Sequence, residues 1–151
     1  MSLLTAVDPV QITAIATEVF AAMVDRQSGL LTAWEGARPI VGDPVYAWVD
    51  LDTDGASRIL LTTDASTADD LTRAFLSMDA SEAVAQADMA DAFGEIANVF
   101  GGNIKALLPE HVGLTLPQVS TRSPSVAGGV QLHEVALSWR GRPLVITLSL
   151  I

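Results

Sequence analysis

The sequence predicts an α+β fold in which a mainly antiparallel β-sheet packs against two long helices. Three observations predict it. Two long segments carry apolar residues at helical spacing, short segments rich in Val and Ile alternate with turn residues, and the order helix then three strands occurs twice. The 151 residues are expected to form a single domain, residues 1–151, because one core usually accommodates about 100 to 200 residues.

The first half of the chain begins with a helix, which we expect over residues 9–27. Asp8 is a favoured N-cap residue, and Pro9 suits the first helical position, where its missing N–H group leaves no hydrogen bond unmade. Apolar residues then recur at helical spacing until Ser28-Gly29 ends the pattern. Three antiparallel strands should follow, near residues 30–38, 44–51 and 57–63.

The second half is expected to begin with a short helix over residues 64–76, capped by Thr63 or Asp64. A long helix then runs over residues 81–108, and Pro109 ends it. Three more strands should follow, separated by turn residues, over residues 113–120, 130–138 and 143–151. Helix plus three strands therefore forms a pseudo-repeat.

Composition excludes several classes of function. Eight basic residues against eighteen acidic ones give a formal net charge of −10, which argues against nucleic-acid binding and favours a basic surface on a partner. The absence of cysteine excludes disulfides, thiolate catalysis and Cys-ligated metal sites. Two histidines cannot form a three-histidine metal site.

Membrane and export signals are not expected. No apolar run approaches the roughly 20 residues that span a bilayer. The N-terminal segment has no basic residue before Arg26, so it does not have the pattern of a signal peptide. The expected localisation is the cytoplasm.

Two other candidate sites have simpler interpretations. Asp50–Gly55 begins like a calcium loop of the form D-x-D-x-D-G, but Leu61 occupies the twelfth position, where such loops carry a bidentate carboxylate. A hairpin turn is therefore favoured. His111 and His133 have no nucleophile or metal ligand at a characteristic spacing, and we expect a surface or strand position for both.

The long helix has two distinct faces. At about 100° per residue, its apolar residues fall within about 40° of one line and predict a core stripe of Phe93, Ala97, Phe100, Ile104 and Leu107. The opposite face carries Asp91, Glu95, Asn98 and Gly102, which we call the exposed strip. Glu95 and Asn98 are spaced i and i+3, so they present adjacent polar head groups.

Two features of this face favour a functional surface over a merely solvated one. Asparagine is a poor helix former, and Gly101 and Gly102 each cost about 1 kcal/mol relative to alanine in a helix interior. Such residues are expected where another backbone or a partner approaches closely.

The same helix carries a family motif. The run from Asp91 through Glu95 and Asn98 resembles the signature helix of the CheC/CheX/FliY chemotaxis phosphatases, in which Asp or Ser is followed after three residues by Glu and after two more by Asn. Gly102-Asn103 resembles the continuation common in CheX-type members. Downstream, the segment around Pro117 resembles the proline-containing strand that follows this helix in the family. The matching order of elements spans nearly the whole chain.

This resemblance implies dephosphorylation of a phosphorylated aspartate on a CheY-like response-regulator receiver domain. Glu95 would pair with the receiver lysine beside the phosphoryl group, and Asn98 would orient a water for in-line attack. Asp91 is carried over as a supporting residue, and Gly101 and Gly102 are expected at the partner surface. The chain would need no cofactor of its own, because the receiver supplies Mg²⁺.

The first helix departs from the CheC pattern, in which a second Glu-x-x-Asn is common. This chain has Glu18 and Ala21 at the matching place, so a second site is expected to be dead or absent. A single site makes the chain more similar to CheX, which implies a homodimer formed through the sheet. The apolar last strand, residues 144–151, would suit an exposed edge for that contact.

Two alternatives stay open. One is a non-catalytic module of the same fold that binds a receiver domain, a CheD-like protein or a flagellar switch component. The other, more distant, is a small-ligand binding domain, for which the sequence shows no convergent polar cluster.

Overall fold

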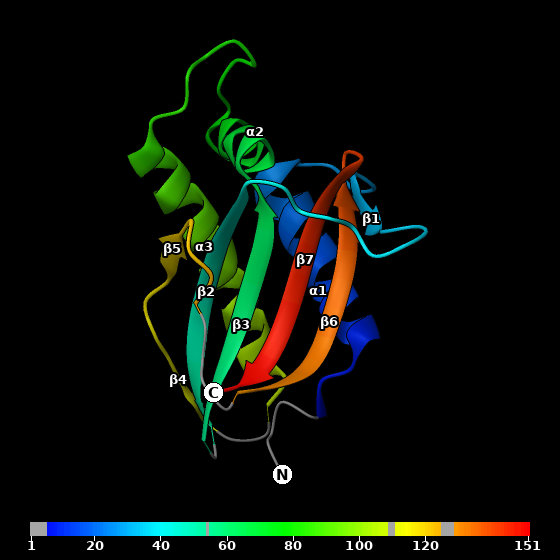
Figure 1. The fold of residues 1–151 in the computed structure, drawn as a ribbon, viewed down its shortest axis with the longest axis vertical. Coiled ribbons are helices and arrows are strands. Elements are labelled where there is room, and N and C mark those ends of the chain that lie inside the picture. The colour runs from blue at the N-terminus through cyan, green and yellow to red at the C-terminus, as the bar shows by residue number, and fades with distance from the viewer. Residues whose placement is uncertain (1–5, 54, 109–110, 125–128) are drawn as a thin grey trace.

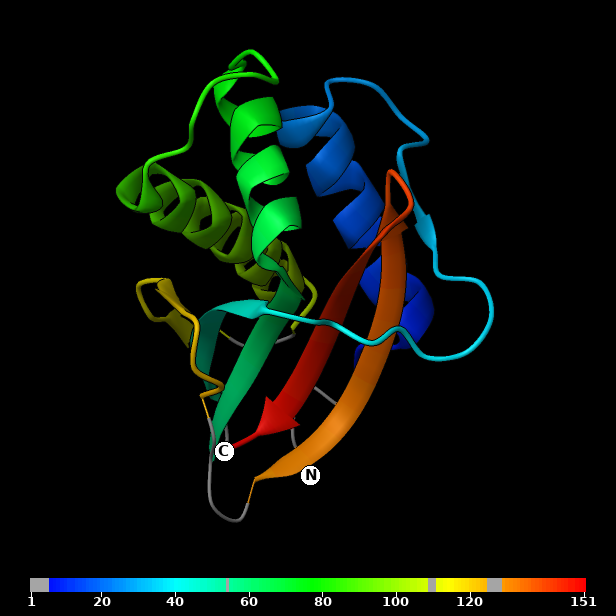
Figure 2. The ribbon, with the colours of Figure 1, turned by 45° about the horizontal axis from the view of Figure 1, so that its top comes forward.

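An antiparallel sheet forms the centre of the computed structural model, which describes residues 6–53, 55–108, 111–124 and 129–151. Within these residues the sheet has seven strands in the order β1-β6-β7-β3-β2-β4, and β5 pairs with the same edge of β2 as β4 does. The helices cover one face of the sheet (Figures 1 and 2), which confirms the α+β fold. The strands are β1 (Leu31–Ala33), β2 (Pro44–Thr53), β3 (Gly55–Asp64), β4 (Gly113–Leu114), β5 (Gln118–Ser120), β6 (Val130–Trp139) and β7 (Arg142–Leu150).

The strand pairing contains the predicted pseudo-repeat. The β2–β3 hairpin of the first half and the β6–β7 hairpin of the second half meet where β3 pairs with β7. In addition, β1 of the first half pairs with β6, and β5 of the second half pairs with β2. Each half therefore contributes short strands to the hairpin of the other half: β1 from the first half, and β4 and β5 from the second.

The first helix begins as predicted but is shorter than expected. Asp8 Oδ1 accepts a hydrogen bond from the Gln11 N–H at 2.8 Å, and the Gln11 side chain accepts one from the Asp8 N–H at 3.0 Å. The expected helix over residues 9–27 ends early, because the backbone widens into a π-helix and Arg26 then adopts a left-handed conformation with φ of 55°. The helices are α1 (Pro9–Val19), η2 (Phe20–Val24), α2 (Ala65–Leu76) and α3 (Gln86–Ala106).

Helix α3 begins later and ends earlier than predicted. Ser81-Glu82 belongs to a turn, because the Glu82 carboxylate accepts a hydrogen bond from the Asp79 N–H at 3.1 Å and the Glu82 N–H donates to the Asp79 carbonyl at 3.0 Å. Since the helix ends before residue 107, Leu107 is 45% exposed and Leu108 is buried in its place. The rest of the predicted core stripe is buried: Phe93, Ala97, Phe100 and Ile104. Pro109, the expected stop, lies outside the described residues.

Two strand predictions were too long. The segment 113–120 forms two short strands, because Pro117 has no N–H group to continue the ladder along β2. The strand expected over residues 30–38 is only β1, because the chain turns away at Gly36, whose φ is 88°.

The last strand lies inside the sheet, so the expected exposed edge at residues 144–151 is wrong. Strand β7 pairs with β3 on one side and with β6 on the other, as Figure 1 shows. Leu144, Val145 and Ile146 are buried in succession, which means that both faces of this part of β7 are covered. The continuous apolar run reflects an interior strand and not an edge that seeks a partner.

The segment Asp50–Gly55 lies at the tip of the β2–β3 hairpin that the sequence predicted: residues 50–53 end β2 and Gly55 begins β3. The register pairs Thr53 with Gly55, and Asp54 lies outside the described residues. The Asp50 carboxylate accepts hydrogen bonds from Arg58 Nε at 2.7 Å and from Arg58 Nη2 at 2.9 Å. This bidentate pair ties the two strands together.

Candidate functional site

Helix α3 presents the exposed strip on the side away from its core contacts. Asp91 and Glu95 are exposed, and Asn98 and Gly102 are partly exposed. The other side of the helix packs against β2 and against helices α1 and α2. The strip is therefore carried by a helix that the core holds in place, which fixes the spacing of its head groups. The buried residues of the other side are Met89, Ala92, Phe93, Ile96, Ala97, Phe100 and Ile104.

The polar side chains of the strip have no partner in the described part of the chain. Neither a hydrogen bond nor an ion pair joins the side chain of Asp91, Glu95 or Asn98 to another described residue. A carboxylate accepts hydrogen bonds, whereas a carboxamide both donates and accepts them. Glu95 is therefore available to a cation, and Asn98 is available to a water molecule or an oxyanion.

A shallow hollow of about 410 Å³ lies beside the strip. Asp91 and Glu95 line it from α3, and Pro117 and Val119 line it from the segment around β5. Gly94 permits this contact, because a Cβ atom at Gly94 would already lie 3.4 Å from Val119 Cγ2. Gly94 and Val119 were not predicted to belong to the site, although a glycine between Asp91 and Glu95 is a signal for close packing.

The two adjacent glycines of α3 have different surroundings. Gly101 is buried, and a Cβ atom at this position would lie 2.5 Å from Val49 Cγ2 on β2. Gly101 therefore packs against the sheet, and the partner contact expected for it does not fit this position. Gly102 is partly exposed, and a Cβ atom there would meet no described atom within 4 Å. Packing against the described residues therefore does not require a glycine at Gly102.

The other candidates do not join the strip. His111 is exposed beyond the end of α3, and His133 lies in β6, as expected. Among the described residues, no three His, Asp or Glu side chains are grouped so that they could hold a metal ion. In the same part of the chain, no helix is both long and apolar enough to cross a membrane. Ala21, at the matching place on the first helix, lies in the π-helical turn η2.

Comparison with models of protein families identifies the family to which this chain belongs. Residues 45–135, which include the whole of α3, match the model of a family described as chemotaxis phosphatase CheX. The match covers more than half of the chain. The chain belongs to the CheX family. Membership places it at family level among the chemotaxis phosphatases, as the sequence resemblance implied. A search of curated proteins found no match.

Solved structures of CheX and related proteins share the fold. Chemotaxis protein CheX from Vibrio vulnificus is similar over 94% of this chain and 95% of its own, with a TM-score of 0.69 and 16% identity. CheX in the CheX-CheY-BeF3-Mg complex from Borrelia burgdorferi is similar over 95% and 97%, with a TM-score of 0.67 and 14% identity. FliY from Thermotoga maritima is similar over 92% and 83%, with a TM-score of 0.63 and 14% identity. At these identities the similarity shows the CheX fold.

Proposed function

We propose that this CheX-family chain is a phosphoaspartyl phosphatase that acts on a CheY-like response-regulator receiver domain. The observation that carries the proposal is the pair Glu95 and Asn98, which lie about one turn apart on the exposed strip and have no partner in the described part of the chain. Family membership and the fold shared with a CheX solved in complex with CheY support it.

Glu95 would dock the receiver. Its exposed carboxylate would form an ion pair with the receiver lysine beside the phosphoryl group, which places the phosphoaspartate against α3. Asp91, one turn earlier on the same face, would extend the acidic surface toward basic groups of the receiver and accelerate their encounter. The net charge of −10 suits a partner whose contact surface is basic.

Asn98 would position the attacking water. The carboxamide can accept a hydrogen bond from the water and donate one to a phosphoryl oxygen, and it keeps both abilities as the pH changes. The water oxygen forms a bond to phosphorus as the bond between phosphorus and the aspartyl oxygen breaks. The products are inorganic phosphate and the restored aspartate carboxylate. An acyl phosphate is a mixed anhydride and is already activated, so positioning and charge stabilisation suffice.

Mg²⁺ would be held by the receiver, where it would supply charge neutralisation at the phosphoryl oxygens. The neighbouring structure from Borrelia burgdorferi is named as a CheX-CheY complex that contains BeF3 and Mg²⁺. This chain would contribute Glu95, Asn98 and the water.

A dephosphorylation assay tests the proposal. A CheY-like receiver is phosphorylated with acetyl phosphate and Mg²⁺, the donor is removed, and loss of phosphate is followed with and without the chain. Asn98→Ala should slow the accelerated rate about 100-fold or more, the scale of losing one positioned hydrogen-bonding group. Asn103→Ala is the matched control, because Asn103 is an exposed asparagine of the same helix outside the strip.

The outcome also separates catalysis from binding alone. Equal rates for the wild type and Asn98→Ala would contradict the phosphatase proposal. Binding of the receiver without acceleration by either protein would instead support a non-catalytic receiver-binding module, the alternative drawn from the sequence.

The oligomeric state, a second protein partner and the cellular location are also matters of proposal. We propose a cytoplasmic homodimer that also binds a CheD-like protein. Because β7 is interior, the dimer contact would use the outer edge of β6, where β1 pairs only with Leu137, Ser138 and Trp139 in the described chain. Light scattering that gives the mass of a monomer at all concentrations would contradict the dimer, and co-purification tests CheD binding.

A further inference from the structure

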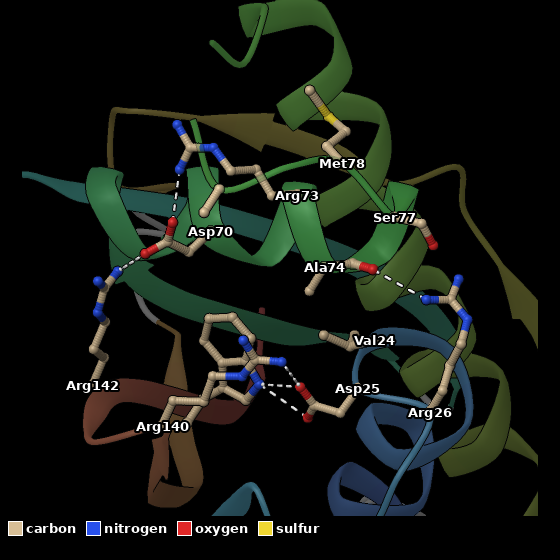
Figure 3. Close-up of a pocket in the computed structure, with 12 residues that line it drawn as sticks. Val24, Asp25, Arg26, Asp70, Arg73, Ala74, Ser77, Met78, Arg140 and Arg142 are labelled. Atoms are coloured by element: carbon tan, nitrogen blue, oxygen red, sulfur yellow. Dashed lines mark hydrogen bonds and ion pairs between the residues drawn. The ribbon is translucent and has the colours of Figure 1, made fainter. Parts of the chain in front are cut away.

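A cavity of about 440 Å³ lies between α2, the end of η2 and the turn that joins β6 to β7. Figure 3 shows that its charged side chains come from these three places in the chain and form two linked groups, Asp25 with Arg140 and Asp70 with Arg73 and Arg142. It has no lining residue in common with the exposed strip or the hollow beside it. Its charged residues are Asp25, Arg26, Asp70, Arg73, Arg140 and Arg142.

The cavity is basic in an acidic protein. Four of the eight basic residues of the chain line it, together with two aspartates, which leaves a formal excess of +2 (4 − 2). The chain as a whole carries −10. Such a concentration of cations is the convergent polar cluster that the sequence did not show.

The Asp25 carboxylate is already neutralised by the protein. Its side chain is 1% exposed, and it accepts hydrogen bonds from Trp139 Nε1 at 3.1 Å and from Arg140 Nη2 at 2.7 Å. The guanidinium of Arg140 also lies over the Trp139 ring, 4.6 Å from its centroid. The contacts with Asp25 and Trp139 thus fix the position of the Arg140 side chain beside the turn that joins β6 to β7.

The Asp70 carboxylate also has partners within the protein, Arg73 and Arg142. It accepts a hydrogen bond from Arg73 Nη1 at 2.7 Å and forms an ion pair with Arg142 through its other oxygen. Both guanidinium groups therefore point toward one carboxylate on α2, and Figure 3 shows them on different sides of it. Asp70 alone carries too little charge to neutralise both arginines, although Arg142 also interacts electrostatically with Asp64.

Several guanidinium donors remain unused. Within the described chain, Arg73 Nη2, Arg142 Nη2 and Arg140 Nη1 have no hydrogen-bond acceptor. Arg26 differs, because its Nη1 and Nη2 donate to the carbonyls of Ala74 and Phe75 at the end of α2. The free donors belong to fixed, planar groups, which suit the tetrahedral oxygens of a phosphate better than a flexible lysine does.

We propose that this cavity binds a small molecule that carries a doubly charged phosphate group. The phosphate would balance the excess charge and accept the unused donors of Arg73, Arg140 and Arg142. The volume lies within the range of small-ligand pockets, roughly 300 to 1,000 Å³. The remaining wall is partly apolar, with Val24, Met78 and the Trp139 ring, and offers contact to an organic group attached to the phosphate.

Calorimetric titration of the full chain tests the proposal with three probes: inorganic phosphate, adenosine monophosphate and adenosine. The two phosphate-bearing probes should bind saturably with a Kd below about 1 mM, and adenosine should not bind. Equal affinity for the two would show that the phosphate alone is recognised, and tighter binding of the nucleotide would show that the apolar wall contributes. An acidic glutamate peptide that binds where neither phosphate probe does would overturn the proposal in favour of a protein partner.

Charge variants complete the test. Arg142→Gln should weaken phosphate binding about tenfold, the scale of one charge-assisted hydrogen bond. Asp70→Asn should strengthen binding, because it releases Arg73 and Arg142 from their carboxylate, whereas a purely structural cluster predicts no gain.

Arg122→Gln is the control, since it removes the same charge from an exposed position outside the cavity. Equal weakening by Arg122→Gln, or no binding by the wild type, would overturn the proposal. Thermal melts check that each variant is folded.

Discussion

Gly101 of α3 lies directly against Val49 of β2, so close that a Cβ atom on Gly101 would come within 2.5 Å of Val49 Cγ2. Both residues are buried, and Leu114 of β4 closes the contact, at 3.3 Å from the same Cβ position. The absence of a side chain at Gly101 therefore sets how closely the helix that carries the exposed strip approaches the sheet.

Gly101→Ala should destabilise the fold. The added methyl group must displace Val49 in a packed core, which typically costs about 1 to 3 kcal/mol and outweighs the helix propensity gained. Urea denaturation followed by circular dichroism measures the change. A stability equal to or above that of the wild type would show that α3 can shift away from β2 without cost. Val49→Ala in the same background should recover part of the loss, because it removes the atom that clashes.

Gly102→Ala should have the opposite effect on stability. Its Cβ atom meets open space, so alanine should stabilise α3 by up to about 1 kcal/mol. If the receiver packs on the strip as proposed, the same methyl group should slow dephosphorylation while the protein becomes more stable. The assay of the proposed function measures this, and an unchanged rate would place Gly102 outside the contact.

Arg140→Gln should cost more stability than Asp25→Asn, although both break the same ion pair. The Asp25 side chain is 1% exposed and Arg140 is 46% exposed, so loss of the arginine leaves a buried charge without a counter-ion. Loss of the charge at residue 25 instead leaves an arginine that can reach water, and an asparagine oxygen can still accept from Trp139. We expect about 2 kcal/mol for Arg140→Gln and about 1 kcal/mol for Asp25→Asn. Chemical denaturation of both variants checks the order, and the reverse order would contradict it.

The exposed strip was predictable because it depends on local periodicity alone. Residues spaced by three or four along one helix share a face whatever surrounds the helix, so Glu95 and Asn98 could be placed together before the fold was known. The turn that delays the start of α3 was not predictable in this way, because Ser81-Glu82 satisfies the pattern of a helix start equally well.

Long-range pairing explains what the sequence did not reveal. The interior position of β7 follows from its pairing with β3, which is distant in the chain. A run of apolar residues has the same sequence pattern in a central strand as in an edge strand, so the pattern alone could not place β7. The basic cavity has the same origin. Arg26 follows η2, Arg73 lies in α2 and Arg142 begins β7, so only the packing of α2 against η2 and the position of the hairpin turn bring them together.

Asp64, the N-cap of α2, should make stability depend on pH in the acid range. Burial alone would raise the pKa of its carboxyl, but the hydrogen bond from the Thr67 N–H, at 2.7 Å, and the charge of Arg142 hold the pKa below its ordinary value of 3.8. The folded state therefore favours the carboxylate. This contribution is fully present above the unfolded value and is lost as the pH falls through the lower, folded value.

Two variants isolate this effect. Asp64→Ala should lose about 1 kcal/mol at pH 7, because the Thr67 N–H loses its acceptor. Asp64→Asn keeps an acceptor and caps nearly as well, but it has no charge to lose. The stability difference between the wild type and Asp64→Asn should therefore shrink as the pH is lowered below 3.8, even while both proteins weaken through their other carboxylates. Urea denaturation at pH 7 and at successive points between pH 5 and about 2.5 measures this difference. A difference that stays constant over that range would mean that the Asp64 charge does not stabilise the cap, and that the hydrogen bond to Thr67 acts alone.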